Sequence, residues 1–280
     1  MPASEQLKTL VDQMPAPDKR DMFNTDIDKE KIEAAIAEIW KGGKDNVLGL
    51  VDLLVEPGQG DDVKPHYALH ALALHVCKLE DKEPRQVFAQ TLASQLGGDR
   101  PKGVQAYLCQ ELGTAGGKEA VEALGKLLTD DELCDPAARA LTAIREGAAE
   151  QFRAALPKAE GKCRLTIVQN LGVLCDEKAL DALKQAADDA DRDTRIAALW
   201  GLGNIGDPGS VALLIKAADA EPGWERIQNT KACLVLAEKL VAAGKQTEAA
   251  RIYKHLRDTR TDRSEKYVRD LAEKALAGAR

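Results

Sequence analysis

Apolar residues recur along most of this chain at intervals of three and four positions, the spacing of one face of an α-helix. The first clear example follows Asp28, where a single helix face holds Ile32, Ala35, Ile36, Ile39 and Trp40. Two glycines follow this run, and glycine commonly ends a helix. We therefore predict a helix from about residue 29 to residue 41.

The same periodicity, interrupted by turns that contain Gly and Pro, predicts a series of helix pairs. A short helix and a Pro-containing link precede the series in residues 1–28, and Asn46 is expected to cap the second helix of the first pair. The predicted pairs cover residues 29–55, 65–96, 102–129, 135–158, 161–189, 192–219 and 225–258, and a last helix covers 264–277.

Three of these pairs contain stretches that align with one another without a gap. The aligned stretches are Gln110–Leu128, Gln169–Ala187 and Trp200–Ala218, with glycines at Gly113, Gly172 and Gly203, and a degenerate copy at 141–156 has Thr142 in the glycine position. A period near 30 residues, built from two short apolar-periodic segments, is typical of a helical solenoid. Such a fold offers an extended surface instead of a deep pocket.

The aligned repeats also predict how their turns are built. We expect each marker glycine to end its first helix, because glycine tolerates a positive φ. Arg164 and Arg195 precede their glycines by eight residues, and Asp176 and Asp207 follow theirs by four. Because these charges recur at the same height in neighbouring repeats, we predict a ladder of Arg–Asp pairs that joins successive turns.

The sixth pair carries a family resemblance. Asp191–Ala220 closely resembles the HEAT-like repeat of the phycobilisome-lyase type, and its matching residues are Arg195, Ala197, Ala198, Leu202, Gly203, Ile205, Gly206, Asp207 and Pro208. The match is weaker at 161–189 and 102–129. The resemblance implies an all-α fold, a right-handed α-α superhelix of the HEAT or armadillo kind with about seven helix pairs.

A second resemblance lies near the C-terminus. Ala232–Leu256 resembles a tetratricopeptide-type helix pair, with Ala-Gly-Lys at its turn and Glu-Ala-Ala-x-x-Tyr in its second helix, although it is not repeated. We therefore expect an N-terminal helix and linker at 1–28, HEAT-like repeats at 29–222, and a tetratricopeptide-like pair with a capping helix at 223–280. We expect these parts to pack as one elongated body.

Charge and composition restrict the class of partner. The 280 residues carry a net charge of −7, which argues against nucleic acid as the main ligand. No apolar run has the length of a membrane span, and the N-terminus has no signal-peptide pattern. We therefore predict a cytoplasmic protein, whereas a signal peptide removed from ahead of Met1 would place it in the periplasm or outside the cell.

The six cysteines form no C-x-x-C pair, which makes structural zinc an unfavoured interpretation. Most fall among apolar residues of predicted helices, as buried reduced thiols do. Cys134 and Cys163 occupy nearly equivalent places in adjacent repeats and are the one pair worth checking for a disulfide. Residues 251–280 hold nine Lys or Arg against five Asp or Glu, which indicates either a solvated helix face or a basic docking end.

Candidate chemistry is sparse. His66 and His70 lie one helical turn apart and could share a metal ion, or they could be surface or packing histidines. HEAT-type hydroxylases hold iron with His-Glu dipeptides, and this chain contains none. A phycobilin lyase would share the repeat, but no lyase residue maps onto this sequence, and no nucleotide or hydrolase motif is present. We therefore predict no cofactor.

The repeat architecture favours a non-enzymatic scaffold that binds another protein or peptide along its second helices. The alternative is an accessory protein or lyase of bilin attachment, or a metal-dependent HEAT-repeat enzyme. We predict a monomer that binds neither nucleic acid nor membrane. The expected partner-facing residues are Glu122, Lys126, Asp181, Lys184 and Lys216 on the second helices, with Trp224 as an exposed aromatic anchor.

Overall fold

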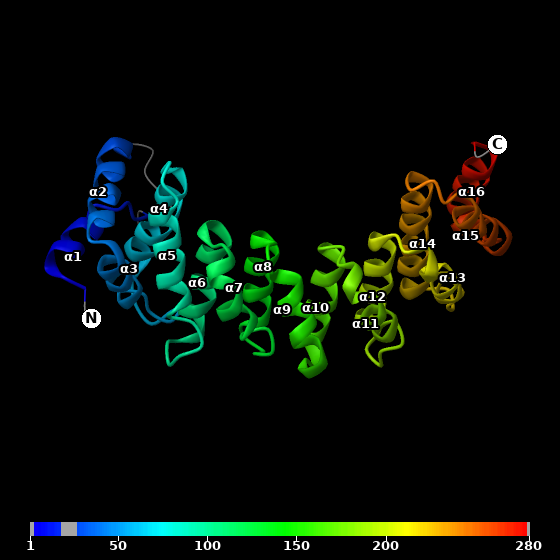
Figure 1. Ribbon diagram of the computed structural model, residues 1–280, viewed down its shortest axis with the longest axis horizontal. Coiled ribbons are helices and arrows are strands. Elements are labelled where there is room, and N and C mark those ends of the chain that lie inside the picture. The colour runs from blue at the N-terminus through cyan, green and yellow to red at the C-terminus, as the bar shows by residue number, and fades with distance from the viewer. Residues whose placement is uncertain (1–2, 18–26, 279–280) are drawn as a thin grey trace. The chain divides into compact units, whose positions relative to one another are not determined.

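Helices make up the regular secondary structure of the described chain. The computed structural model describes residues 3–17 and 27–278, which contain sixteen α-helices, four short 3-10 helices and no strand (Figure 1). A short helix α1 comes first, seven helix pairs follow it in chain order, and a single helix α16 ends the series. This confirms the prediction of an all-α solenoid of about seven helix pairs. The Pro-containing link at residues 14–17 is not helical, and the entry turn expected after it falls largely on residues 18–26, which lie outside the described residues.

The chain divides into two compact units, residues 1–151 and 152–280. Unit 1 contains α1 (Glu5–Val11), α2 (Lys29–Lys41), α3 (Gly43–Asp52), α4 (Val63–Lys78), α5 (Glu83–Ala93), α6 (Lys102–Ala115), α7 (Lys118–Gly125) and α8 (Cys134–Ile144). Helix α9 (Ala148–Ala155) includes the division. The first helices α2, α4, α6 and α8 pack in succession, and so do the second helices α3, α5 and α7.

Unit 2 repeats this arrangement. It contains η1 (Leu156–Lys158), α10 (Gly161–Val173), η2 (Glu177–Ala179), α11 (Leu180–Ala186), α12 (Arg192–Ile205), η3 (Pro208–Ser210), α13 (Val211–Ala218), α14 (Trp224–Ala242), α15 (Gln246–Thr259), η4 (Arg263–Glu265) and α16 (Lys266–Gly278). Helix α12 packs between α10 and α14, and α15 packs against both α14 and α16. Within each unit, neighbouring pairs thus bury their apolar faces against one another, as expected of a repeat fold.

Helix α2 shows how the sequence pattern becomes structure. The side chain of Asp28 accepts a hydrogen bond from the backbone N–H of Lys31 at 3.0 Å and so caps the N-terminus. The predicted apolar positions of α2 are buried except Trp40, which is half-buried. Asn46, however, lies inside α3 instead of capping it, and its Nδ2 donates to the carbonyl oxygen of Ile39 at 2.8 Å. Asn46 therefore supplies a hydrogen-bond donor to a carbonyl group at the C-terminus of α2, the preceding helix.

The marker glycines do not end their helices, contrary to the prediction. Gly113, Gly172 and Gly203 lie within α6, α10 and α12, and the positive φ of this turn belongs to Gly206, the residue after α12. A Cβ added to Gly172 would lie 2.7 Å from the Cα of Gly201, and one added to Gly203 would lie 2.8 Å from the carbonyl oxygen of Ala232. These two glycines therefore allow neighbouring first helices to approach closely.

The predicted Arg–Asp ladder is also wrong in its pairing. Arg164 Nε donates to Asp189 at 2.7 Å, and Arg195 forms a two-pronged pair with Glu225 at 3.0 and 3.1 Å. Asp176 pairs instead with Arg153, and Asp207 pairs with Lys184. The arginines reach the end of their own pair or the start of the next first helix, whereas the aspartates face the preceding second helix. Unit 2 therefore has two separate series of ion pairs.

Candidate functional site

The second-helix residues expected to face a partner are largely exposed. Lys126, at the end of α7, contacts Glu122 at 2.8 Å one turn away, and this hydrogen bond lowers the pKa of the Glu122 carboxyl. Asp181 on α11 and Lys216 on α13 are exposed, and Lys184 is half-buried beside Asp207. These side chains are distributed over α7, α11 and α13.

The exposed apolar side chains have a different distribution. Every large hydrophobic residue that is exposed in the described chain lies on a first helix or on α16, and none lies on a second helix. These residues are Val63 and Leu74 on α4, Val173 on α10, Trp200 on α12, Trp224, Ile227 and Val241 on α14, and Tyr267 and Leu271 on α16. Among the first helices of the described chain, α4, α10, α12 and α14 therefore carry exposed large apolar side chains, whereas α2, α6 and α8 do not.

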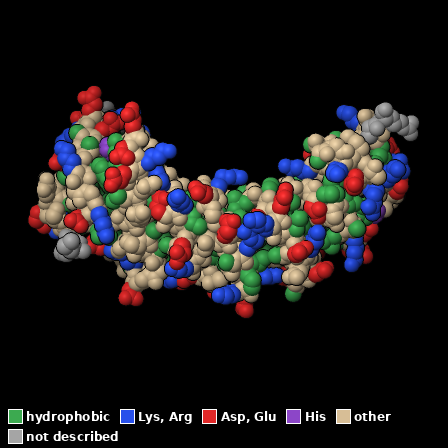
Figure 2. Space-filling view, viewed as in Figure 1, with side chains coloured by type: hydrophobic (Ala, Val, Ile, Leu, Met, Phe, Trp, Pro, Cys, Tyr) green, Lys and Arg blue, Asp and Glu red, His purple; other side chains and the backbone are tan. Residues whose placement is uncertain are grey.

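Two tryptophans stand out in this set. Trp224, the first residue of α14, is 59% exposed, and Trp200 on α12 is 38% exposed. The Trp200 ring lies over Gly172 of α10, where an added Cβ would come within 3.1 Å of it. Figure 2 shows hydrophobic side chains interspersed with Lys and Arg over α10 and α12 on the face that it presents. Rigid aromatic side chains at a surface are typical anchors for protein partners.

A polar cluster joins α4 to α6 in unit 1. His70 Nδ1 lies 3.1 Å from a carboxylate oxygen of Glu111, whose side chain is fully buried, and Tyr107 donates its hydroxyl to the carbonyl oxygen of His66 at 2.7 Å. Burial raises the pKa of the Glu111 carboxyl, and the contact with His70 opposes this rise. The contact between His70 and Glu111 was not predictable from the sequence, because the two residues are separated by 41 positions.

The histidines proposed as weak metal candidates are engaged within this cluster. His66 Nδ1 lies 3.2 Å from Asp62 and its ring packs against Tyr107 at 4.2 Å, while His70 contacts Glu111. Across residues 3–17 and 27–278, no group of three or more His, Cys, Asp or Glu side chains is arranged to hold a metal ion. His66 and Tyr107 also line a groove of about 730 Å³ beside α6 and α8.

None of the six cysteines, all of which lie within the described residues, forms a disulfide. Cys134 and Cys163, the pair to be checked for a disulfide, are each buried and unbonded to one another. Burial raises the pKa of the Cys109 and Cys233 thiols to about 12. Cys109, Cys134, Cys163 and Cys233 are buried, as expected of most of the cysteines, whereas Cys77 and Cys175 are exposed.

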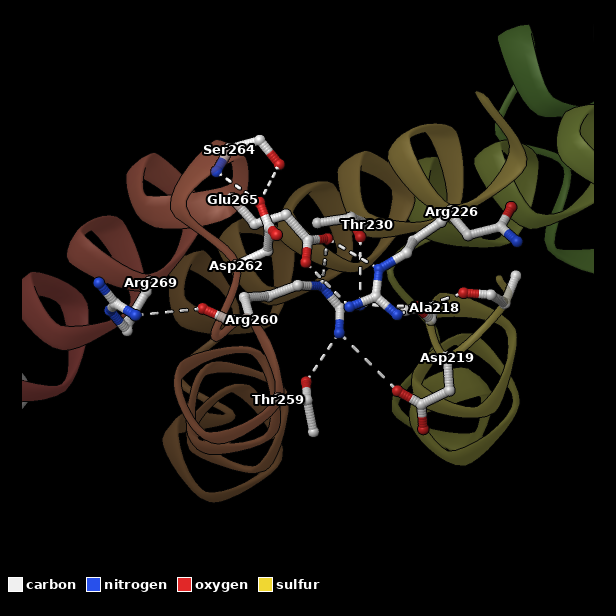
Figure 3. A network of polar contacts seen from close by, with 12 residues as sticks. Ala218, Asp219, Arg226, Thr230, Thr259, Arg260, Asp262, Ser264, Glu265 and Arg269 are labelled. Carbon is white, nitrogen blue, oxygen red and sulfur yellow. Dashed lines mark hydrogen bonds and ion pairs between the residues drawn. The ribbon is translucent and has the colours of Figure 1, made fainter. Parts of the chain in front are cut away.

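The C-terminal basic segment contains a buried arginine that sequence reasoning assigned to an exposed basic surface. Arg260 is fully buried, and its guanidinium donates to the carbonyl oxygen of Ala218 at 2.6 Å and to the hydroxyl of Thr259 at 2.7 Å (Figure 3). Glu265 lies 3.4 Å from Arg260 and also binds Arg226. Arg260 therefore joins the end of α13 to α14, α15 and η4, and it contributes nothing to an exposed basic surface.

Comparisons with known proteins place this geometry among repeat folds. Residues 149–235 match the family described as HEAT repeats. The chain is similar in structure to an engineered protein solved by crystallography, with a TM-score of 0.50, 19% sequence identity, and coverage of 98% of this chain and 78% of that one. The search of curated proteins gives no match.

No helix within the described residues combines the length and the apolar character that a membrane span requires. The family match covers only part of unit 2 and the end of unit 1, whereas the structural similarity extends over nearly the whole chain. Residues 149–235 are thus similar to HEAT repeats, and the described chain has the fold of a HEAT-like helical-repeat solenoid.

Proposed function

We propose that the protein is a non-enzymatic scaffold that binds another protein or peptide through the outer side of its first helices. The observation that carries this proposal is the restriction of exposed large hydrophobic side chains to the first helices and α16. Exposed apolar surface costs free energy in water, and contiguous patches of it commonly mark interaction sites. HEAT repeats generally serve as interaction surfaces, which agrees with this proposal.

In unit 2 the apolar side chains recur in register. Leu165, Ile196 and Ile227 are spaced 31 residues apart on α10, α12 and α14, in step with the arginines at 164, 195 and 226. Ile227 is exposed and the other two are half-buried. Trp200 lies one turn after Ile196 on the same side of α12. A partner laid across these helices would meet an apolar column with an aromatic side chain beside it.

The charged positions on the second helices remain a second proposed surface. Three of these positions are exposed, namely Glu122, Asp181 and Lys216. Because their side chains do not pack in the core, their substitution should leave the fold intact. They provide the matched test of which side of the repeats binds. We prefer the first-helix side because exposed apolar and aromatic groups supply more binding free energy than solvated charges do.

The test compares two double variants for retention of a partner identified by cross-linking and mass spectrometry. Trp200→Ala with Ile227→Asp should reduce retention at least tenfold, a change of about 1.4 kcal/mol. Glu122→Lys with Asp181→Lys should leave retention unchanged. The reverse outcome would transfer the proposal to the second helices. Circular dichroism and thermal unfolding serve as the folding control for both.

The lyase-type resemblance and the metal-dependent alternative call for a different measurement. Metal analysis and an absorbance spectrum of the purified protein would detect a stoichiometric metal or a bound pigment. Either finding would contradict a purely structural scaffold. The lyase-type and tetratricopeptide-type resemblances concern the shape of the repeats, and function has to be argued from the residues at a site.

A further inference from the structure

Helix α14 carries an exposed apolar stripe along its outer side. Trp224, Ile227, Leu234 and Val241 follow one another at three- and seven-residue spacings, which places them along one face of the helix. Ile227 is 43% exposed and Val241 is 39% exposed, while Leu234 is half-buried. The opposite side of α14 packs into unit 2 through four buried residues, Ala232, Cys233, Leu236 and Leu240.

The same stripe contains two opposite charges that have no partner within the described chain. Lys231 and Glu238 are both exposed, and neither takes part in an ion pair or side-chain hydrogen bond among residues 3–17 and 27–278. They are seven residues apart, a rise of about 10.5 Å, so they cannot contact each other. In contrast, Lys266 and Asp270 on α16 pair at 2.7 Å one turn apart.

The order of these residues is self-complementary about Leu234. Ile227 and Val241 lie seven residues before and after Leu234, and Lys231 and Glu238 lie three before and four after it. In an antiparallel copy of α14 centred on the same leucine, each isoleucine would face a valine. Each Lys231 would also face a Glu238, within about one residue rise of 1.5 Å. A two-fold axis requires this kind of self-complementary surface.

A cavity stands where the remaining aromatic residue would fall. In the antiparallel alignment Trp224 of one copy lies opposite the end of α14 in the other copy, just beyond Ala242. A cavity of about 380 Å³ opens there, lined by Val241, Ala249, Tyr253 and Leu276. This size lies within the range of about 300–1,000 Å³ typical of binding pockets. Glu238 and Gln246 also line the cavity, but most of its lining is apolar, so the exposed indole of Trp224 would meet a largely apolar receptor on a second copy.

We propose that the protein forms an antiparallel homodimer through α14, in which Lys231 pairs with Glu238 of the second copy and Trp224 enters its 380 Å³ cavity. The proposal rests on the proposed function, since it uses the same first-helix side, and it names a second copy of this chain as a partner. It replaces the monomer expected from the sequence. One helix of 19 residues is only about 28 Å long, so the dimer should be weak and concentration-dependent.

The test is sedimentation velocity of the full chain at about 1 to about 200 µM. The wild type should shift from monomer to dimer over this range. Lys231→Glu and Glu238→Lys should each weaken dimerisation at least tenfold, because each places like charges opposite one another twice. The double variant should restore the dissociation constant to within about threefold. Trp224→Ala should also weaken dimerisation, and Lys239→Glu, an exposed change off the stripe, should not.

A wild type that stays monomeric throughout, or a double variant that stays as weak as the single ones, overturns the proposal. The outcome is separable from that of the proposed function. If the wild type is monomeric and Trp200→Ala still abolishes binding of a different protein, the dimer is overturned and the proposed function is not. Circular dichroism of each variant confirms that the substitutions, all of exposed residues, leave the helices folded.

Discussion

Cys175 has a left-handed backbone conformation that is unfavourable for a residue with a side chain. Its φ is 52°, and the equivalent residue of the next repeat is Gly206, with a φ of 82°. The left-handed conformation costs a residue with a Cβ roughly 1–2 kcal/mol, whereas a glycine adopts it freely. Cys175→Gly should therefore raise the free energy of unfolding by about 1 kcal/mol, after the extra entropy of an unfolded glycine is subtracted.

The reciprocal substitution provides the control for this strain. Gly206→Ala should lower the free energy of unfolding by about 1–2 kcal/mol, because an added Cβ would also meet the Lys239 side chain at 3.1 Å. Urea unfolding with an unchanged slope gives both values. Equal effects of the two substitutions, in sign and size, would show that backbone strain is not the cause.

The buried carboxyl of Glu111 should make the stability of the protein depend on pH. Burial raises the pKa of its carboxyl above the ordinary value of 4.5, so the folded state holds this proton more tightly than the unfolded state does. The stabilising contribution is complete below about 4.5 and is lost as the pH rises through the raised pKa. Glu111→Gln should remove this loss. The free energy of unfolding of the variant relative to the wild type should therefore increase from pH 4.5 upward.

A matched control separates Glu111 from the other carboxyls. The pKa of Glu122 is lowered by its hydrogen bond with Lys126, so Glu122→Gln should change the pH profile only below its ordinary value of 4.5. The pKa of Asp189 is likewise lowered, chiefly by Arg164, and its contribution belongs to the acid side. Parallel profiles of the wild type and Glu111→Gln between pH 4.5 and 8 would contradict the assignment.

At the scale of the helix, close approach between first helices depends on glycines that have no room for a methyl group. Gly203→Ala would place a Cβ 2.8 Å from the carbonyl oxygen of Ala232, so α12 and α14 would have to separate. We expect a loss of about 1–3 kcal/mol in the free energy of unfolding. At Gly113, an added Cβ meets Ala140 at an ordinary 3.5 Å.

Gly113→Ala is therefore the control, and it should stabilise the protein by about 0.5–1 kcal/mol through the higher helix propensity of alanine. Thermal or urea unfolding measures both variants. The opposite signs expected at two aligned glycines make the prediction specific. If Gly203→Ala stabilised the protein as Gly113→Ala should, the close approach of α12 and α14 would not depend on the absence of a Cβ at residue 203.

These glycines also show how far the sequence determined the structure. Their common spacing was sufficient to find the repeats and to place most helices, because apolar periodicity is a local property. Their role was not predictable, because it depends on which residue of the next helix lies opposite. The same holds for Arg164, which binds Asp189 instead of Asp176, and for His70 and Glu111. Pairing across repeats is a property of packing that one sequence does not reveal.

Substitution of Arg260 tests whether this buried side chain stabilises the packing of the last helices on α13. It is fully buried and donates to the carbonyl oxygen of Ala218, which would otherwise lose its partner at the end of that helix. Arg260→Met should lower the free energy of unfolding by about 2–4 kcal/mol, since several charge-assisted hydrogen bonds disappear. Arg257→Met removes an exposed pair with Asp258 and serves as the control, with an effect under about 0.5 kcal/mol. Similar losses in both variants would argue against a structural role for the buried site.

At the scale of the whole molecule, the question is which segments fold together. The two compact units divide at residue 151, inside α9, whereas the change in repeat type predicted from the sequence lies near residue 222. Within unit 2, α14 packs on both α12 and α13, so the helices on either side of residue 222 share contacts. Arg195 and Glu225 add an ion pair across this point, with Nε and Oε1 3.0 Å apart.

Truncation after Pro222 therefore tests the proposal that residues 29–222 and 223–280 form one body. Leu202 and Leu214 are fully buried in the whole chain, and α14 covers the helices that carry them. Without α14–α16 this apolar side would be exposed, and Arg195 would lose its carboxylate partner. We expect the 1–222 fragment to aggregate or to elute as large oligomers in size-exclusion chromatography, whereas the full chain stays soluble. A soluble, monomeric fragment with cooperative thermal unfolding would show instead that the C-terminal helices are an appended module, because the repeats before them would then be stable without a cover.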